Sequence, residues 1–107
     1  MGVVATPREV LEDLEPGVRV RYRRSEPPPP YTYAITVEVE ERGVWQTVRL
    51  WDNADDVNEH HMHQYSRRRG KENPVILQFN SINEAMAAAK DEARMRAAEI
   101  VRQWRES

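Results

Sequence analysis

The sequence predicts one α+β domain over residues 1–107, in which an antiparallel sheet of about four strands packs on a long C-terminal helix. A short N-terminal helix completes the predicted fold. Two observations predict the sheet: apolar and polar residues alternate in the segments 18–23 and 31–51, which is the period of a half-buried strand. A third predicts the long helix, because apolar residues recur at helical spacing between 82 and 104. Together these elements favour a sandwich of two layers.

The short N-terminal helix is expected to start at Thr6-Pro7-Arg8-Glu9. This run offers a capping threonine, a proline at the first helical position and a glutamate for a capping box. Val10, Leu11 and Leu14 would give the helix one apolar side. The turn pair Pro16-Gly17 should end it.

The strands follow from alternation and turn residues. Residues 18–23 alternate Val18, Val20 and Tyr22 with arginines, and 31–51 should form a hairpin about a tight turn at 41–43. On its second arm, Trp45 and Trp51 fall on the same face as Arg49. That face is either covered by the helix or a loop, or it is an exposed recognition surface. The apolar run 74–79 predicts the fourth strand.

The long helix begins at a capping box, Ser81-Ile82-Asn83-Glu84, and is expected to reach about Trp104. Its apolar stripe should pack on the sheet, and small alanines in its middle allow a close approach. The stripe consists of Ile82, Ala85, Met86, Ala89, Ala93, Ala97, Ile100, Val101 and Trp104.

Composition excludes several classes of protein. The chain has no cysteine, which rules out disulfides, thiolate zinc sites and cysteine nucleophiles. It has no apolar run of about 18 residues and no signal peptide, so we expect a cytoplasmic protein that does not enter a membrane. The net charge is −2, but nearly all of the 16 basic residues are arginine, which binds phosphate well. Local clustering of arginine therefore matters more than the total charge.

The stretch 51–71, WDNADDVNEHHMHQYSRRRGK, holds the candidate functional residues. It shows neither strand nor helix period, so we expect a long polar loop, and such loops are often functional. All three histidines of the chain lie inside this stretch, within the four positions 60–63. The candidate catalytic residues are Asp52, His60, His61, His63 and Tyr65, and the candidate RNA-binding residues are Arg67, Arg68 and Arg69.

Three interpretations of this stretch stay open. In the first, His61 with His63 on an extended backbone, or His60 with His63 on a helical one, joins Asp52, Asp55 or Asp56 in a metal site. In the second, histidines act as acid and base in RNA cleavage, since histidine titrates near neutral pH. The arginines would then stabilise phosphate charge, and Tyr65 would donate a proton or stack a base. In the third, the stretch is a solvated loop with balanced charges.

A family resemblance bears on this choice. A hairpin arm ending in Trp51-Asp52-Asn53, then His60-His61-Met62-His63 and Tyr65, a short strand and a long C-terminal helix resemble the TumE-like toxins of prokaryotic toxin–antitoxin pairs. The likeness covers roughly residues 31–104. Here a tryptophan precedes Asp-Asn where the family usually has tyrosine, and the segment 54–59 lengthens the spacing to the histidines.

The resemblance implies a toxin that acts on RNA or on translation, with a helix-turn-helix antitoxin as its partner. It implies functional roles for Asp52, His61 and His63, and also for His60 and Tyr65. We therefore expect a toxin-like domain, a possible ribonuclease, that cleaves RNA or binds RNA or the ribosome without a metal or another cofactor. The alternatives are a protein-interaction module that docks through its tryptophans and a metal-binding protein.

Overall fold

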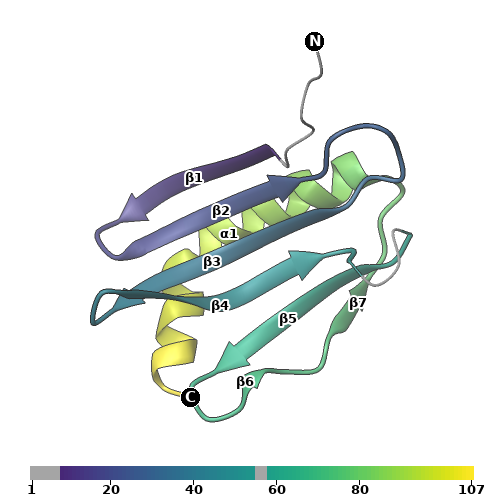
Figure 1. The fold of residues 1–107 in the computed structure, drawn as a ribbon. Coiled ribbons are helices and arrows are strands. Elements are labelled where there is room, and N and C mark those ends of the chain that lie inside the picture. Colours follow the sequence, from purple (N-terminus) through teal and green to yellow (C-terminus); the bar gives the residue numbers. More distant parts are fainter. Residues whose placement is uncertain (1–7, 55–57) are drawn as a thin grey trace.

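A computed structural model of the chain describes residues 8–54 and 58–107, and leaves the side chain of Arg8 aside. The described elements form one sheet and one helix (Figure 1). In chain order they are β1 (Arg8–Glu15), β2 (Val18–Arg24), β3 (Tyr33–Glu41), β4 (Val44–Asp52), β5 (His60–Ser66), β6 (Gly70–Lys71), β7 (Val75–Leu77) and α1 (Ile82–Arg105).

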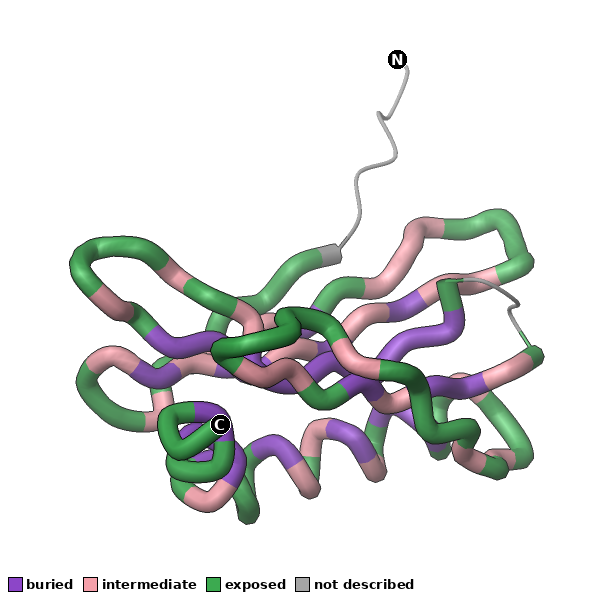
Figure 2. The backbone as a smooth tube through the Cα atoms, turned by 90° about the horizontal axis from the view of Figure 1, so that it is seen from below, coloured by how far each residue is buried: buried purple, intermediate pink, exposed green. Residues whose placement is uncertain are grey.

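The sheet is an antiparallel meander in which each strand from β1 to β6 pairs with the next. The short strand β7 also pairs with β5, so β6 and β7 share the outer edge of that strand. The helix α1 lies across one face, which we call the covered face, and none of the described residues forms a helix on the other, the open face (Figure 1). Seen edge-on, the domain has the two predicted layers (Figure 2).

The core lies between α1 and the covered face. Alternate residues of β2 and β3 point into it, among them Val20, Ile35 and Val37, which are fully buried. The predicted stripe of α1 meets them, and all of its members are buried except Ile82, which packs at the margin. The Ser81 hydroxyl accepts a hydrogen bond from the amide of Glu84 at 3.1 Å, as the capping box predicts. The long helix and its packing are thus confirmed.

The N-terminal helix was a wrong prediction, because Arg8–Glu15 is the strand β1. The turn at Pro16-Gly17, with Gly17 at φ +77°, closes a hairpin rather than ending a helix. Acidic β1 lies beside basic β2, with Asp13 opposite Arg19 and Glu9 ion-paired to Arg21. This pairing outweighs a weak helix preference. Thr6 and Pro7, the predicted cap, lie outside the described residues.

The strand count was also too low. Besides β1, the polar stretch expected as a loop contains β5 and β6. Its first residues continue β4, and His60–Ser66 pairs with β4 on one side and with β6 and β7 on the other. Tertiary pairing therefore organises a segment whose own composition carries no apolar period.

The two tryptophans of β4 lie on opposite faces, contrary to the sequence expectation. The register between β3 and β4 shifts between Val37 and Glu38, which leaves Val48 as an extra residue in β4. Trp51 therefore lies on the covered face, 1% exposed, whereas Trp45 lies half-buried on the open face. There the Arg19 guanidinium stacks 3.8 Å from the Trp45 ring centroid.

Within the described part of the chain, no helix combines the length and the apolar character that a membrane crossing requires.

Candidate functional site

The alternation of β5 sorts the candidate residues onto two faces. His61 and His63 lie opposite Asp52 and Leu50 of β4, and these four residues share the open face. Tyr65 follows at the next position of the same face. His60 points to the covered face instead. The structure thus places four of the five predicted catalytic residues on one face and the fifth, His60, on the other. This separation is expected, because adjacent residues of an extended strand point to opposite faces.

His61 is held by a carboxylate. Its Nε2 lies 2.8 Å from Oε1 of Glu59, whose side chain is 43% exposed. Its Nδ1 is enclosed and has no hydrogen-bond partner among the described residues. Asp52, the register partner of His61, is on the same side of the sheet. Of the two ring nitrogens of His61, Nε2 is therefore directed to a surface carboxylate and Nδ1 is enclosed.

His63 is held by the backbone. Its Nδ1 lies 3.0 Å from the carbonyl oxygen of Glu72, and a carbonyl can only accept, so Nδ1 carries the hydrogen. In the neutral ring, Nε2 is then the proton acceptor. That atom is not among the enclosed unpaired atoms. The His61 and His63 ring centroids are 6.2 Å apart, so the two imidazoles are neighbours with different tautomer constraints.

Burial and charge also act on Tyr65. Burial raises the pKa of its phenol, and the negative charge of Asp52 adds to the rise. The phenol therefore stays protonated at neutral pH and can donate a hydrogen bond. Its cross-strand neighbour is Lys71 of β6, which places a cation on the same face. Sequence reasoning missed Lys71, because only the pairing of β5 with β6 brings it there.

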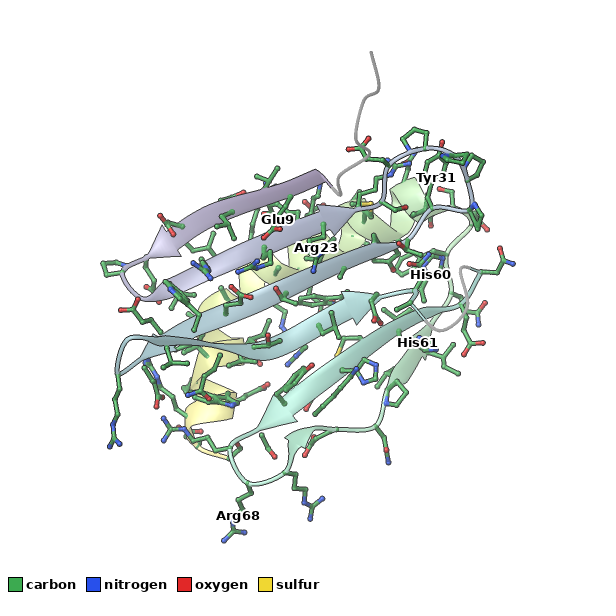
Figure 3. All side chains as sticks on the ribbon, in the orientation of Figure 1. Glu9, Arg23, Tyr31, His60, His61 and Arg68 are labelled. Carbon is green, nitrogen blue, oxygen red and sulfur yellow. The ribbon has the colours of Figure 1, made fainter. Side chains whose placement is uncertain are left out.

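His60 has a structural environment. Its Nδ1 lies 2.9 Å from the hydroxyl of Tyr33, and its ring meets Phe79 edge-on with centroids 5.6 Å apart. Burial lowers the pKa of His60, and His61 lowers it further, so the ring is kept neutral. Burial and the charge of Asp52 raise the pKa of Tyr33 to about 12, which keeps its hydroxyl a donor. Figure 3 shows His60 and His61 at the start of β5.

Asn53 closes the end of β4 and does not face the histidines. Its side chain is fully buried; Oδ1 accepts from the amide of Tyr33 at 2.9 Å and Nδ2 donates to the carbonyl of Tyr31 at 3.1 Å. These bonds fix where β3 begins relative to the end of β4. The Asp-Asn pair therefore combines a residue of the open face with a buried backbone clamp.

The arginine run lies in the turn between β5 and β6. Arg67 forms an ion pair with Glu41, and its guanidinium lies 4.5 Å from the Trp104 ring centroid. Arg68 and Arg69 are exposed, and Figure 3 shows Arg68 directed away from the sheet. Arg69 and Lys71 line a shallow hollow with Glu72, the residue that holds His63. The run is thus near the end of β5, with its members in different environments.

The arginine face of β2 is largely neutralised. Glu38, buried on the open face, accepts from Nε of Arg19 at 2.7 Å and from Nε of Arg21 at 3.1 Å. Arg23 is exposed and lies on the same face of the sheet (Figure 3). The basic patch expected from β2 therefore contains fewer available charges than its sequence indicates.

For the metal alternative, the described residues contain no cluster of three or more histidine, aspartate or glutamate side chains placed to hold an ion. Two of the acids considered as ligands, Asp55 and Asp56, lie outside the described residues. Of the residues considered for the metal site, Asp52, His61 and His63 are described and share the open face.

We compared the chain with protein-family models, curated proteins and solved structures, and none of them matches it. The function proposed below therefore draws on the geometry of the open face together with the resemblance noted in the sequence.

Proposed function

We propose that this domain is the toxin-like member of a toxin–antitoxin pair and that it cleaves RNA by metal-independent acid–base catalysis. The observation that carries the proposal is the pair of neighbouring imidazoles on the open face. Each ring is fixed through one nitrogen by a different partner, Glu59 for His61 and the Glu72 carbonyl for His63. Acid–base catalysis of strand cleavage needs two such groups with opposite protonation states.

His63 suits the role of base. Its Nδ1–H is held by a carbonyl, which leaves Nε2 to accept the proton of a ribose 2′-hydroxyl. The 2′-oxygen then forms a bond to phosphorus while the bond from phosphorus to the 5′-oxygen breaks. Lys71, beside Tyr65 on the same face, supplies positive charge for the developing phosphorane.

His61 suits the role of acid. In the free protein its Nε2 faces Glu59, a side chain that reaches the surface and can be displaced by the substrate. The leaving 5′-oxygen would take the place of the Glu59 carboxylate and receive the Nε2 proton. A protonated His61 would also have Asp52 opposite it across the strand pair. Asp52 is thus the positioning residue for the acid, whereas Glu59 holds Nε2 of His61 until the substrate binds.

The partner implied by the resemblance is a helix-turn-helix antitoxin, and we include it in the proposal. The rival module, docking through its tryptophans, is less well supported because Trp51 lies under α1 and Trp45 lies under Arg19. Trp51 offers no surface to a partner, and Arg19 occupies one face of the Trp45 ring.

The decisive test substitutes each histidine of the open face. His61→Ala and His63→Ala should each reduce RNA cleavage about 10²–10⁴-fold and relieve growth inhibition. The melting temperature should stay near that of the parent, because neither ring packs in the core between sheet and helix. Gln64→Ala, an exposed change directly after His63 but on the other face of β5, is the matched control and should keep activity.

Two further readouts separate the mechanism from its rivals. A chelator should leave the cleavage rate unchanged, and loss of activity with chelator would assign the histidines to a metal. RNA affinity should fall as salt rises, because bound phosphates release counterions. Undiminished cleavage by both histidine variants would refute the mechanism.

A further inference from the structure

A cleft opens where β4 and β5 stop pairing. Among the described residues, the two strands pair between 49–52 and 61–64, and they diverge beyond Arg49 and Gln64 (Figure 1). The space between them is about 350 Å³ and is lined by Gln46 and Thr47 of β4 and by Tyr65 of β5. Trp104, Arg67 and Glu41 also line it.

Arg67 is fixed in this cleft by three contacts. Its guanidinium carbon lies 4.5 Å from the centroid of Trp104, and its Nη2 pairs with the Glu41 carboxylate. Its backbone amide donates to the Ser107 hydroxyl at 2.9 Å. Even so, 43% of the Arg67 side chain remains exposed. A guanidinium that is stacked on one face and exposed elsewhere is a ready platform for a second planar group.

The charge of Arg67 is largely compensated by Glu41. This makes Arg67 a poor phosphate ligand compared with Arg68, which is exposed in the same turn. By contrast, stacking depends on the flat shape of the guanidinium and tolerates a neutralising partner. RNA bases commonly stack on aromatic rings and on arginine planes. The arrangement of Trp104, Arg67 and Glu41 therefore fits a base better than a phosphate.

We propose that this cleft binds a nucleobase of the RNA strand, stacked on the Arg67 guanidinium with its edge directed to Gln46, Thr47 and Glu41. The proposal rests on the function proposed above and assigns the substrate position next to the scissile bond. Tyr65 provides the connection, because it lines the cleft and also follows His63 on the open face.

The spacing agrees with an adjacent nucleotide. Tyr65 and His63 are two residues apart on an extended strand, which is about 7 Å along the chain. Successive nucleotides of an extended strand are separated by a similar length, so a base in the cleft would bring a neighbouring phosphate to His63. Tyr65 would then lie beside both the bound base and the nucleotide at His63.

The polar groups of the cleft indicate which bases bind best. The Glu41 carboxylate accepts hydrogen bonds and cannot donate them, and Gln46 offers an amide that does both. Guanine presents two adjacent N–H donors on its pairing edge, whereas uracil presents one between two carbonyl oxygens. We therefore infer a preference for guanine over uracil.

The test uses Arg67→Lys, which keeps the positive charge and removes the plane. Binding of GMP and UMP is measured by calorimetric titration of the full chain carrying His63→Ala, so that catalysis does not interfere. GMP should bind more tightly than UMP, and Arg67→Lys should weaken GMP at least about fivefold, since stacking a base is worth about 1–3 kcal/mol. Arg105→Lys, an exposed change in the last turn of α1 outside the cleft, is the matched control and should bind GMP as the parent does.

The outcomes separate this inference from the proposed function. GMP binding that depends on Arg67 in a chain that cleaves no RNA supports the cleft and refutes the nuclease. RNA cleavage without base preference, unchanged by Arg67→Lys, supports the nuclease and refutes the cleft. If Arg67→Ala weakens binding but Arg67→Lys does not, the residue holds a phosphate and the stacking proposal is wrong. Absence of saturable binding by every mononucleotide also overturns it.

Discussion

The covered and open faces of the sheet treat polar residues in opposite ways. On the covered face, the buried side chains are mostly apolar, and the buried Arg49 guanidinium donates to Gln103 of α1 at 3.3 Å. On the open face, charged groups form networks, such as Arg19 and Arg21 on Glu38. One sheet thus packs its first face against α1, and its second face carries the groups to which we assign the proposed chemistry.

Adjacent histidines show the difference most clearly. His60 and His61 are neighbours in sequence, and both are about 5% exposed. His60 is packed between Tyr33 and Phe79 and is kept neutral, whereas His61 faces the carboxylate of Glu59. Burial alone therefore does not distinguish a histidine in a structural environment from one to which we assign a catalytic role. The face of the strand and the chemistry of the partner do.

The largest effect should come from placing a charge in the covered face. Ala93, 0% exposed, packs at the centre of α1 against the sheet, so Ala93→Glu would bury an unpaired carboxylate. We expect a loss of several kcal/mol, about 3 or more, in the free energy of unfolding. Met95→Glu places the same side chain on the outer side of α1, where Met95 is 84% exposed, and should change little. Denaturant titration of both variants gives the comparison. Equal midpoints would show that the assigned packing of α1 is wrong.

An intermediate effect should come from His60, and it should depend on pH. Burial lowers the pKa of His60 below its ordinary value near 6.5, so the unfolded chain binds the proton more readily. The stability that neutral His60 provides is therefore fully present above about pH 6.5 and is lost as the pH falls, by at most about 1.4 kcal/mol per unit.

Removing the titrating ring should remove that dependence. His60→Gln can still accept from Tyr33 but cannot charge, so its unfolding free energy should fall less between pH 7.5 and 5.5, roughly the span over which an ordinary histidine titrates. Thermal melts of parent and variant at matched pH give the comparison. Curves that stay parallel over this range would show that His60 is not held neutral by the fold.

The smallest effect should come from the open face away from the histidines. Trp45→Leu keeps an apolar side chain but removes the ring under Arg19, and we expect a loss of about 0.5–1 kcal/mol. Repeating the change in an Arg19→Ala background should abolish most of that loss. RNA cleavage should be unaffected. Loss of function with an intact fold would instead support a docking surface at Trp45.

Much of the fold was predictable because its signals are local. The capping box at Ser81, the stripe of α1 and the alternation of β2 and β3 each depend on residues close in sequence. The N-terminal strand was not predictable in this way. Its residues Val10, Leu11 and Leu14 fit a helix equally well, and only the opposite charges of β2 decide for a strand.

The candidate site was predictable in its membership more than in its arrangement. An extended backbone was one of the two conformations considered for the histidines, and it correctly groups His61 with His63. The contacts of Glu59 and Glu72 with the histidines could not be predicted from the sequence, because Glu59 acts through its side chain and Glu72 through its backbone carbonyl. The same holds for Arg67, whose partners Glu41 and Trp104 are distant in sequence.

The outer edge of β5 is closed by two short strands rather than by one long one. β6 contributes two residues and β7 three, and the connection between them carries the carbonyl that holds His63. Short ladders at an edge open at low free-energy cost, without disturbing the rest of the sheet. The short strands β6 and β7, which flank the imidazole-bearing β5 on its outer side, should therefore open more readily than the central strands. A substrate strand could reach the enclosed rings through such local opening while α1 and the central strands stay folded.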